Sequence, residues 1–133
     1  MCRFLMVRSE EEISVAEILN EFSIACKNSR EWQGDGWGVC WLDSRQKWQG
    51  YKSLKPIWEE VEKFKNIPNS KIFLVHARAS SFDNHKGNLD FNQPFVSDNI
   101  CFVFNGFLKG VTGLNAKGQI GSQKLFSIFC ELY

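Results

Sequence analysis

The sequence has no long hydrophobic run and almost no excess of charge of either sign. A membrane-spanning helix needs about 18 or more consecutive apolar residues, and Glu10–Glu12 interrupt the N-terminus where a secretory signal is apolar. Sixteen Lys and Arg balance fifteen Asp and Glu, which leaves a net charge of +1. The composition therefore argues against membrane binding and against a broad basic surface for nucleic acid.

The sequence also lacks the spacings of common metal, redox and nucleotide sites. Its five cysteines are odd in number and scattered, and no two are separated by two residues, so no CxxC pair is present. The segment Gly34–Gly38 is not a GxGxxG loop, because Val39 stands where the last glycine would be. We therefore expect free, buried thiols in a reducing, cytoplasmic compartment, with neither a metal nor a cofactor.

The 133 residues favour one domain that covers 1–133. With 44% hydrophobic and 23% charged residues, the composition is that of an ordinary globular protein. Loosely alternating strand and helix patterns favour an α+β or mixed layered domain. Strands are predicted at 2–8, 39–42, 47–53, 71–79 and 100–104, and helices at 11–28, from Pro56 to just before Pro68, and from Ser122 onward. The first helix is predicted to follow a capping box at Ser9 and Glu12.

Cys2 is the first residue whose position indicates chemistry. It becomes the N-terminal residue once Met1 is removed, and its thiol then carries a free α-amine on the same residue. The α-amine has a reference pKa of about 7.7–8.0, so it can act as the base that activates the thiol. On position alone, a small residue tolerated after the initiator Met is the simpler interpretation.

Polar residues also end two predicted buried strands. Arg78 is costly to bury unless it meets an anion, and its planar fork suits a carboxylate; alone, a structural Asp or Glu partner is the simpler interpretation. His76, two residues earlier, is more often a satisfied core histidine than a catalytic one. Asn105 and Gly106 read either as a hairpin turn or as an oxyanion hole, made by a side-chain amide and a backbone N–H.

In this order, these segments resemble the class II glutamine amidotransferases, which are N-terminal-nucleophile enzymes. The matching blocks are Met1–Leu5, Gly34–Trp41, His76–Ser81, Gln93–Phe95 and Phe104–Gly106. The likeness extends to about Ser122, and five blocks in the right order make it more specific than any single motif.

The resemblance implies a fold, a reaction and a set of site residues. The fold would be an α-β-β-α sandwich of antiparallel sheets, and Cys2 would attack the side-chain amide of glutamine to form a thioester, releasing ammonia and then glutamate. The resemblance gives catalytic roles to Cys2, Asn105 and Gly106, and substrate binding to Arg78, Ser81, Gly36 and Trp37. Its small-molecule partner would be glutamine or a γ-glutamyl compound, and a synthetase would accept the ammonia.

The chain departs from the family pattern at three positions. Phe104 and Gln93 stand where many members have His, although Gln at position 93 also occurs in relatives. Gly121 stands where the family usually has the Asp that binds the substrate α-ammonium. Either the free amino acid is then held poorly, or Asp83, Asp90 or a partner supplies that charge.

The resemblance also implies further strands after the last predicted helix. We therefore expect the sandwich to be incomplete here, either as a fragment or as a half completed by a second protein, and we expect these residues alone not to form a stable monomer. Two alternatives to glutaminase chemistry stay open: hydrolysis of a γ-glutamyl amide in a small peptide, and a catalytically silent binding or regulatory module. Because the other four cysteines lie in apolar stretches, Cys2 is predicted to be the only reactive thiol.

Overall fold

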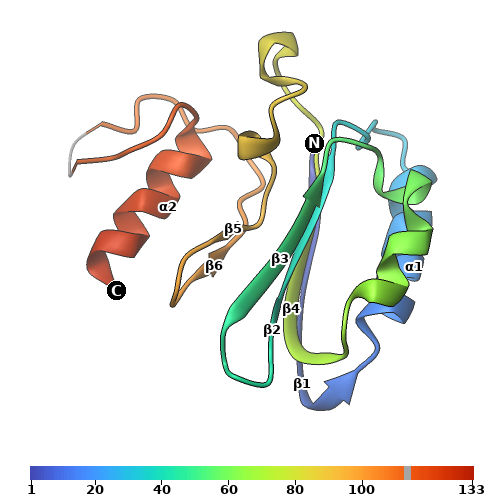
Figure 1. The fold of residues 1–133 in the computed structure, drawn as a ribbon. Helices are drawn as coiled ribbons and strands as arrows, with labels where there is room; N and C mark the ends of the chain where they lie inside the picture. The colour runs from blue at the N-terminus through green and yellow to red at the C-terminus, as the bar shows by residue number, and fades with distance from the viewer. Residues whose placement is uncertain (113–114) are drawn as a thin grey trace.

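Two antiparallel sheets lie between helical segments in the computed structural model, which describes residues 1–112 and 115–133 (Figure 1). The larger sheet has the strand order β1-β4-β2-β3, and the smaller is the ribbon β5–β6. The strands are β1 (Arg3–Ile13), β2 (Trp37–Leu42), β3 (Trp48–Ser53), β4 (Ser70–Ala77), β5 (Phe95–Val96) and β6 (Cys101–Phe102). The α-helices are α1 (Val15–Lys27) and α2 (Gly121–Leu132). This arrangement confirms the α+β class.

The main core lies between α1 and one face of the larger sheet (Figure 1). Leu19, Phe22 and Cys26 recur at helical spacing and are buried against Phe73 and Val75 of β4. The prediction of a helix here is confirmed, but its predicted start is wrong.

The true start of α1 is set by a different capping residue. Ser14 caps α1, and its Oγ accepts a hydrogen bond from the Glu17 backbone N–H at 3.2 Å. Ser9 and Glu12 instead belong to β1, which pairs antiparallel with β4. Long-range strand pairing has overridden the local capping signal.

The central strand β4 is buried on both faces, as its continuous apolar run predicts. It pairs with β1 at one edge and with β2 at the other, and every residue of Phe73–Ala77 is buried. Since side chains alternate along a strand, Phe73 and Val75 face α1, whereas Leu74 and His76 face the ribbon.

The ribbon and α2 form the second half of the molecule (Figure 1). Phe126 of α2 stacks on Phe95 and Phe102, with ring centroids 5.6 and 6.1 Å apart. The predicted strand 100–104 is paired only over Cys101–Phe102 and is half-buried, so the prediction of a fully buried strand is wrong.

A disulfide joins Cys40 of β2 to Cys101 of β6 and ties the ribbon to the larger sheet. The expectation of free thiols is therefore wrong for this pair. Cys130 is exposed near the end of α2, so it is not shielded by burial as predicted. Spacing alone did not reveal the pairing because the two cysteines are 61 residues apart and meet only when the layers pack.

The predicted second helix is two 3₁₀ segments, Ile57–Glu59 and Val61–Asn66. Between them, Glu60 has φ −128° and ψ 29°, outside the helical region. Its buried carboxylate instead accepts hydrogen bonds from Trp37 Nε1 at 3.0 Å and Tyr51 Oη at 3.4 Å. A core polar contact thus replaces a regular helix here.

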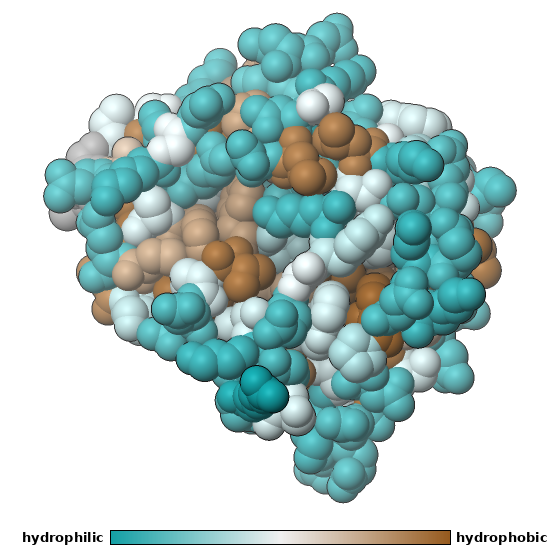
Figure 2. Space-filling view, viewed as in Figure 1, coloured by the Kyte–Doolittle hydropathy of each residue, from teal (hydrophilic) through white to brown (hydrophobic). Residues whose placement is uncertain are grey.

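Apolar side chains are also exposed on this fold. Phe4 and Met6 project from the edge strand β1 and are 46% and 58% exposed, and Figure 2 shows apolar surface over the half that holds α2 and the ribbon. Within the described residues, no helix combines the length and apolar character needed to cross a membrane.

Candidate active site

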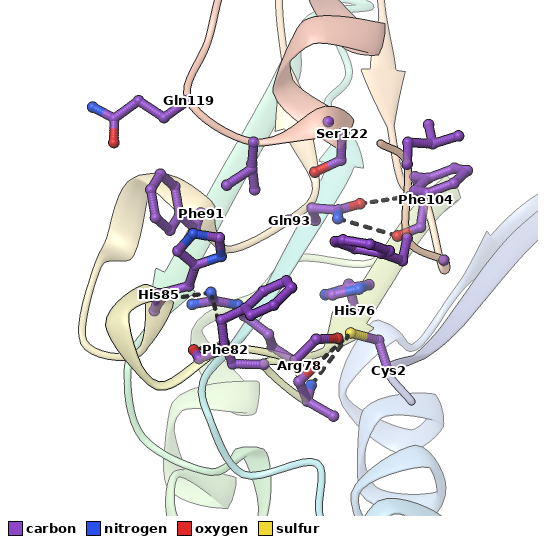
Figure 3. Close-up of a pocket in the computed structure, with 18 residues that line it drawn as sticks. Cys2, His76, Arg78, Phe82, His85, Phe91, Gln93, Phe104, Gln119 and Ser122 are labelled. Carbon is purple, nitrogen blue, oxygen red and sulfur yellow. Dashed lines mark hydrogen bonds between the residues drawn. The ribbon is translucent and has the colours of Figure 1, made fainter. Parts of the chain in front are cut away.

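A cavity of about 320 Å³ lies where the end of β4 meets the segments around the ribbon and the start of α2 (Figure 3). It brings together four of the predicted site residues: Cys2, Arg78, Ser81 and Gly106. These residues are far apart in the sequence, and the pairing of β1 with β4 accounts for the first two. Arg3 is opposite Ala77, which sets Cys2 beside the residues that follow β4.

The Cys2 thiol is half-buried and is held by one residue. Sγ accepts a hydrogen bond from the Ala79 backbone N–H at 3.3 Å and lies 3.4 Å from the Ala79 carbonyl oxygen, to which it donates. Burial raises the pKa of the Cys2 thiol, and the Ala79 N–H, the N-terminal charge and Arg78 only partly offset this. The thiol therefore needs a nearby base to react at neutral pH.

Met1 precedes this thiol at the molecular surface. Its side chain is 73% exposed, and its α-ammonium lies 2.6 Å from Glu31 Oε2. While Met1 is in place, the nitrogen of Cys2 is an amide and cannot accept a proton from the thiol.

Arg78 is a buried cation held by neutral acceptors. It is 6% exposed, and its guanidinium donates to Asn92 Oδ1 at 3.2 Å, to the His85 carbonyl at 2.7 Å and to Ser80 Oγ at 3.4 Å. Within residues 1–112 and 115–133, no carboxylate forms an ion pair with it. The interpretation of Arg78 as half of a structural ion pair is therefore not supported, and its charge faces a cavity instead.

The loop Gly34–Gly38 positions the segment that carries Arg78. The Arg78 N–H donates to the Gly36 carbonyl at 2.8 Å, the Asp35 N–H donates to the Arg78 carbonyl at 3.1 Å, and Asp35 Oδ2 accepts from the Ser80 N–H at 2.7 Å. Gly36 has φ +118°, and a Cβ there would lie 2.2 Å from Asn92 Nδ2. Glycine is thus required where this loop meets the arginine's partner.

Neither Gly36 nor Trp37 lines the cavity, although both were predicted to bind substrate. Trp37 is fully buried on the α1 face, where its ring packs on Phe64 and its Nε1 donates to Glu60. Gly36 and Trp37 therefore belong to the structure that surrounds the cavity, and neither is placed to contact a molecule bound inside it.

His76 differs from the satisfied core histidine that was predicted. It is 1% exposed, and neither ring nitrogen has a hydrogen-bond partner within the part of the chain that the structure describes. Burial, with the charges of Arg78 and Lys52, lowers the pKa of His76 to about 3. It lines the cavity near Cys2 and Arg78, as a neutral imidazole with two unused polar atoms (Figure 3).

Asn105 contacts Cys2 but does not line the cavity, whereas Gly106 lines it. Asn105 Nδ2 donates to the Cys2 carbonyl at 2.8 Å. The Gln93 side chain holds Phe104, the residue before Asn105, through two hydrogen bonds. Its Oε1 accepts from the Phe104 N–H, and its Nε2 donates to the Phe104 carbonyl at 3.1 Å. The buried amide of Gln93 thus holds this segment as a neighbouring strand would, a role that the sequence did not reveal.

The first residues of α2 close another side of the cavity. Gly121 and Ser122 line it, and a Cβ at Gly121 would lie 2.6 Å from the Leu108 carbonyl oxygen. Asp83, one suggested substitute for the missing family acid, pairs with Lys86 at 2.9 Å, and Asp90 does not line the cavity. Among the described residues that line it, none is acidic.

Aromatic side chains form a wall of the cavity that the sequence did not predict. Phe82 packs on Phe107 and on His85, with ring centroids 5.3 and 5.2 Å apart, and His85 packs on Phe91 at 5.3 Å. Phe82 and Phe107 are 43% and 54% exposed, so this wall is open to an incoming molecule. No motif marks it, because the rings come from separate loops.

Comparison with known proteins does not assign a function, so the interpretation of the cavity depends on its geometry. No protein-family model matches this chain, and neither does any curated protein. Within residues 1–112 and 115–133, no three His, Cys, Asp or Glu side chains gather as they do around a metal ion. The site thus offers a thiol, a buried cation, neutral polar groups and an aromatic wall.

Proposed function

We propose that this protein is an N-terminal-nucleophile amide hydrolase of the kind found in class II glutamine amidotransferases. The observation that carries the proposal is that the Cys2 thiol and the buried Arg78 guanidinium, which forms no ion pair with a carboxylate in the described part of the chain, line one cavity. A substrate carboxylate on Arg78 would provide the missing anion. A side-chain amide of the same molecule would then reach toward Cys2, which favours glutamine or a γ-glutamyl compound.

The layered arrangement supports the same proposal. Helix α1, the larger sheet, the ribbon and α2 follow one another across the molecule (Figure 1). This order is compatible with an N-terminal-nucleophile sandwich of which the second sheet is represented by a two-stranded ribbon.

The reaction begins with removal of Met1, which converts the Cys2 amide nitrogen into a free α-amine. The amine takes the thiol proton, and Sγ attacks the amide carbon to form a C–S bond. The Gly106 N–H donates to the negative oxygen of the tetrahedral intermediate, and the second donor is the Asn105 Nδ2 hydrogen that the Cys2 carbonyl does not occupy. Collapse breaks the C–N bond, and the nitrogen takes the proton held by the amine and leaves as ammonia.

Water completes the cycle. It attacks the thioester carbon and passes a proton to the α-amine, the C–S bond breaks, and the γ-carboxylate leaves as the thiol is restored. Because burial raises the pKa of Cys2, little thiolate is present at neutral pH without this amine. The same chemistry acts whether the released group is ammonia or the amine of a small peptide.

The proposal is tested by release of ammonia from glutamine or of amine from a γ-glutamyl amide by the full chain. Cys2→Ala should abolish release, because it removes the atom that forms the thioester. Cys130→Ala is the matched control, since Cys130 is an exposed thiol near the end of α2, and it should leave the rate unchanged. Release that persists in Cys2→Ala would refute the proposal.

A catalytically silent binding module is the second candidate. The observation that favours it is Gly121, where the Leu108 carbonyl fills the space of a side chain, so that the described residues lining the cavity offer no acid to a substrate ammonium. The two candidates differ in the mature N-terminus, which begins at Cys2 only in the hydrolase.

A further inference from the structure

Among the described residues that line the cavity, the only charge at neutral pH is positive. Arg78 brings a full positive charge, and the N-terminus of α2, at Gly121 and Ser122, brings the partial positive charge of a helix start. His76 is held neutral by its burial. Among the described lining residues none carries a carboxylate, so a substrate ammonium would meet like charge and no counter-ion.

The nearest acidic side chains are already engaged. Asp35 accepts hydrogen bonds from the Ser80 N–H at 2.7 Å and from Trp32 Nε1 at 3.3 Å, and Asp83 pairs with Lys86. At Gly121 itself, the Leu108 carbonyl fills the space that a side chain would need. The packing of α2 on the Leu108 segment therefore leaves no room for an acidic side chain at position 121.

Neutral polar groups and aromatic rings occupy the remaining surface. His76 is more than nine-tenths buried, lines the cavity and has two unpartnered ring nitrogens, one a donor and one an acceptor. These atoms suit an amide N–H or C=O. The exposed rings of Phe82 and Phe107 suit an apolar group attached beyond that amide.

We propose that the site prefers γ-amides whose α-nitrogen is acylated, and so uncharged, over free glutamine, with the acyl group lying on the Phe82–Phe107 wall. This inference rests on the proposed function, because it assigns the carboxylate to Arg78 and the γ-amide to Cys2. The inference goes beyond the proposed function by naming the substrate class, which is an N-acyl-glutamine or an N-acyl-γ-glutamyl amide.

The experiment compares N-benzoyl-L-glutamine, N-acetyl-L-glutamine and L-glutamine as substrates of the full chain with Met1 removed. Ammonia release gives kcat/KM, and we expect both acylated compounds to exceed glutamine by about tenfold to a hundredfold, the span of one uncompensated charged contact. A second readout does not need turnover: N-benzoyl-L-glutamate should protect Cys2 from iodoacetamide at a lower concentration than L-glutamate does.

A variant supplies the missing charge. Ser122→Asp adds a carboxylate at the cavity in the first turn of α2, a position that favours an acid, and should shift the preference toward glutamine by at least about tenfold. Where Ser122→Asp lowers the Tm, Gln119→Glu places the charge at an exposed position of the same cavity. Ser44→Asp adds equal charge at the exposed turn between β2 and β3 and should leave the preference unchanged.

The outcomes separate this inference from the function on which it rests. Ammonia release that is equal for the three substrates, or faster with glutamine, overturns the inference and leaves the hydrolase standing. No release and no protection of Cys2 by either glutamate compound overturns both. Preference for the acylated compounds that Ser122→Asp or Gln119→Glu reverses, while Ser44→Asp does not, supports it.

Discussion

The planar guanidinium of Arg78 donates hydrogen bonds from two nitrogens, a geometry that a lysine cannot reproduce. Its two terminal nitrogens contact Asn92, Ser80 and the His85 carbonyl while the group faces the cavity. Arg78→Lys should raise KM, or the concentration of a protecting glutamate compound, by about tenfold, which corresponds to a loss of about 1.5 kcal/mol for one charge-assisted bond.

The matched control for this change is Arg8→Lys, at an exposed position of β1. It should change neither KM nor the Tm. Unaltered binding in Arg78→Lys, with a normal Tm, would show that no substrate carboxylate lies on the guanidinium.

Protonation of His76 makes the free energy of unfolding depend on pH. Its folded pKa is about 3, below the unfolded value of 6.5. Between these values the unfolded chain binds a proton that the folded chain does not, so the free energy of unfolding falls as the pH falls, by at most about 1.4 kcal/mol per pH unit. At pH above 6.5 this contribution is fully present.

Denaturant unfolding between pH 7 and pH 4 measures this slope. His76→Gln should flatten the pH dependence by up to one proton per molecule, whatever its effect on stability at pH 7, because glutamine does not titrate. A slope identical to that of the original protein would mean that His76 already binds its proton in the folded state.

At the scale of the elements, the disulfide between Cys40 and Cys101 joins β2 covalently to β6. Cys40 and Cys101 close a loop with a sequence separation of 61. In the chain-entropy treatment, a loop of this size lowers the free energy of the folded state relative to the unfolded state by about 4 kcal/mol. Cys101→Ser should therefore lower the Tm by many degrees, and Cys130→Ser, which removes a free and exposed thiol, should not.

Peptide mapping without reductant checks the same link directly. A crosslinked peptide that contains Cys40 and Cys101 is expected. Free thiols at both positions, with the Tm unchanged by reductant, would show that the ribbon is held by packing alone.

The elements that could be predicted are those with a strong local pattern. The apolar run of β4 and the helical spacing of α1 each specify their structure, and both are confirmed. The start of α1 was predicted wrongly because β1 resumes its pairing with β4 at Ile13, after a register shift that contains the capping signal. The second predicted helix failed because Glu60 turns inward to meet Trp37, a contact that no local pattern reveals.

The site was predictable to the extent that its residues occur in contiguous blocks. Cys2, Arg78, Ser81 and Gly106 line one cavity, whereas Asn105, Gly36 and Trp37, which were predicted with them, do not. The unpartnered ring of His76 and the Phe82–Phe107 wall depend on how separate segments pack, so sequence spacing carried no sign of them. The resemblance assigned Trp37 to the substrate, whereas strand alternation turns its ring toward α1.

The whole molecule leaves apolar side chains of its edge strand in contact with solvent. Phe4 and Met6 lie on the face of β1 opposite α1 and are about half exposed. We predict that the chain does not persist as a stable monomer at micromolar concentration and self-associates through this strand. Met6→Lys should shift sedimentation toward the monomer, whereas Glu10→Lys, a polar change on the same strand, should not. A cooperative, strictly monomeric fold of the original chain would contradict this.

The central claim is that Cys2 is a processed N-terminal nucleophile in a site for γ-amides. The most direct measurement is mass spectrometry of the full chain after incubation with a glutamine-mimicking diazo ketone, followed by peptide mapping. We predict an N-terminus that lacks Met1 and a single adduct on Cys2, formed more slowly in Arg78→Lys. An N-terminus that retains Met1, or an adduct that forms on Cys130 and not on Cys2, would contradict the proposed chemistry.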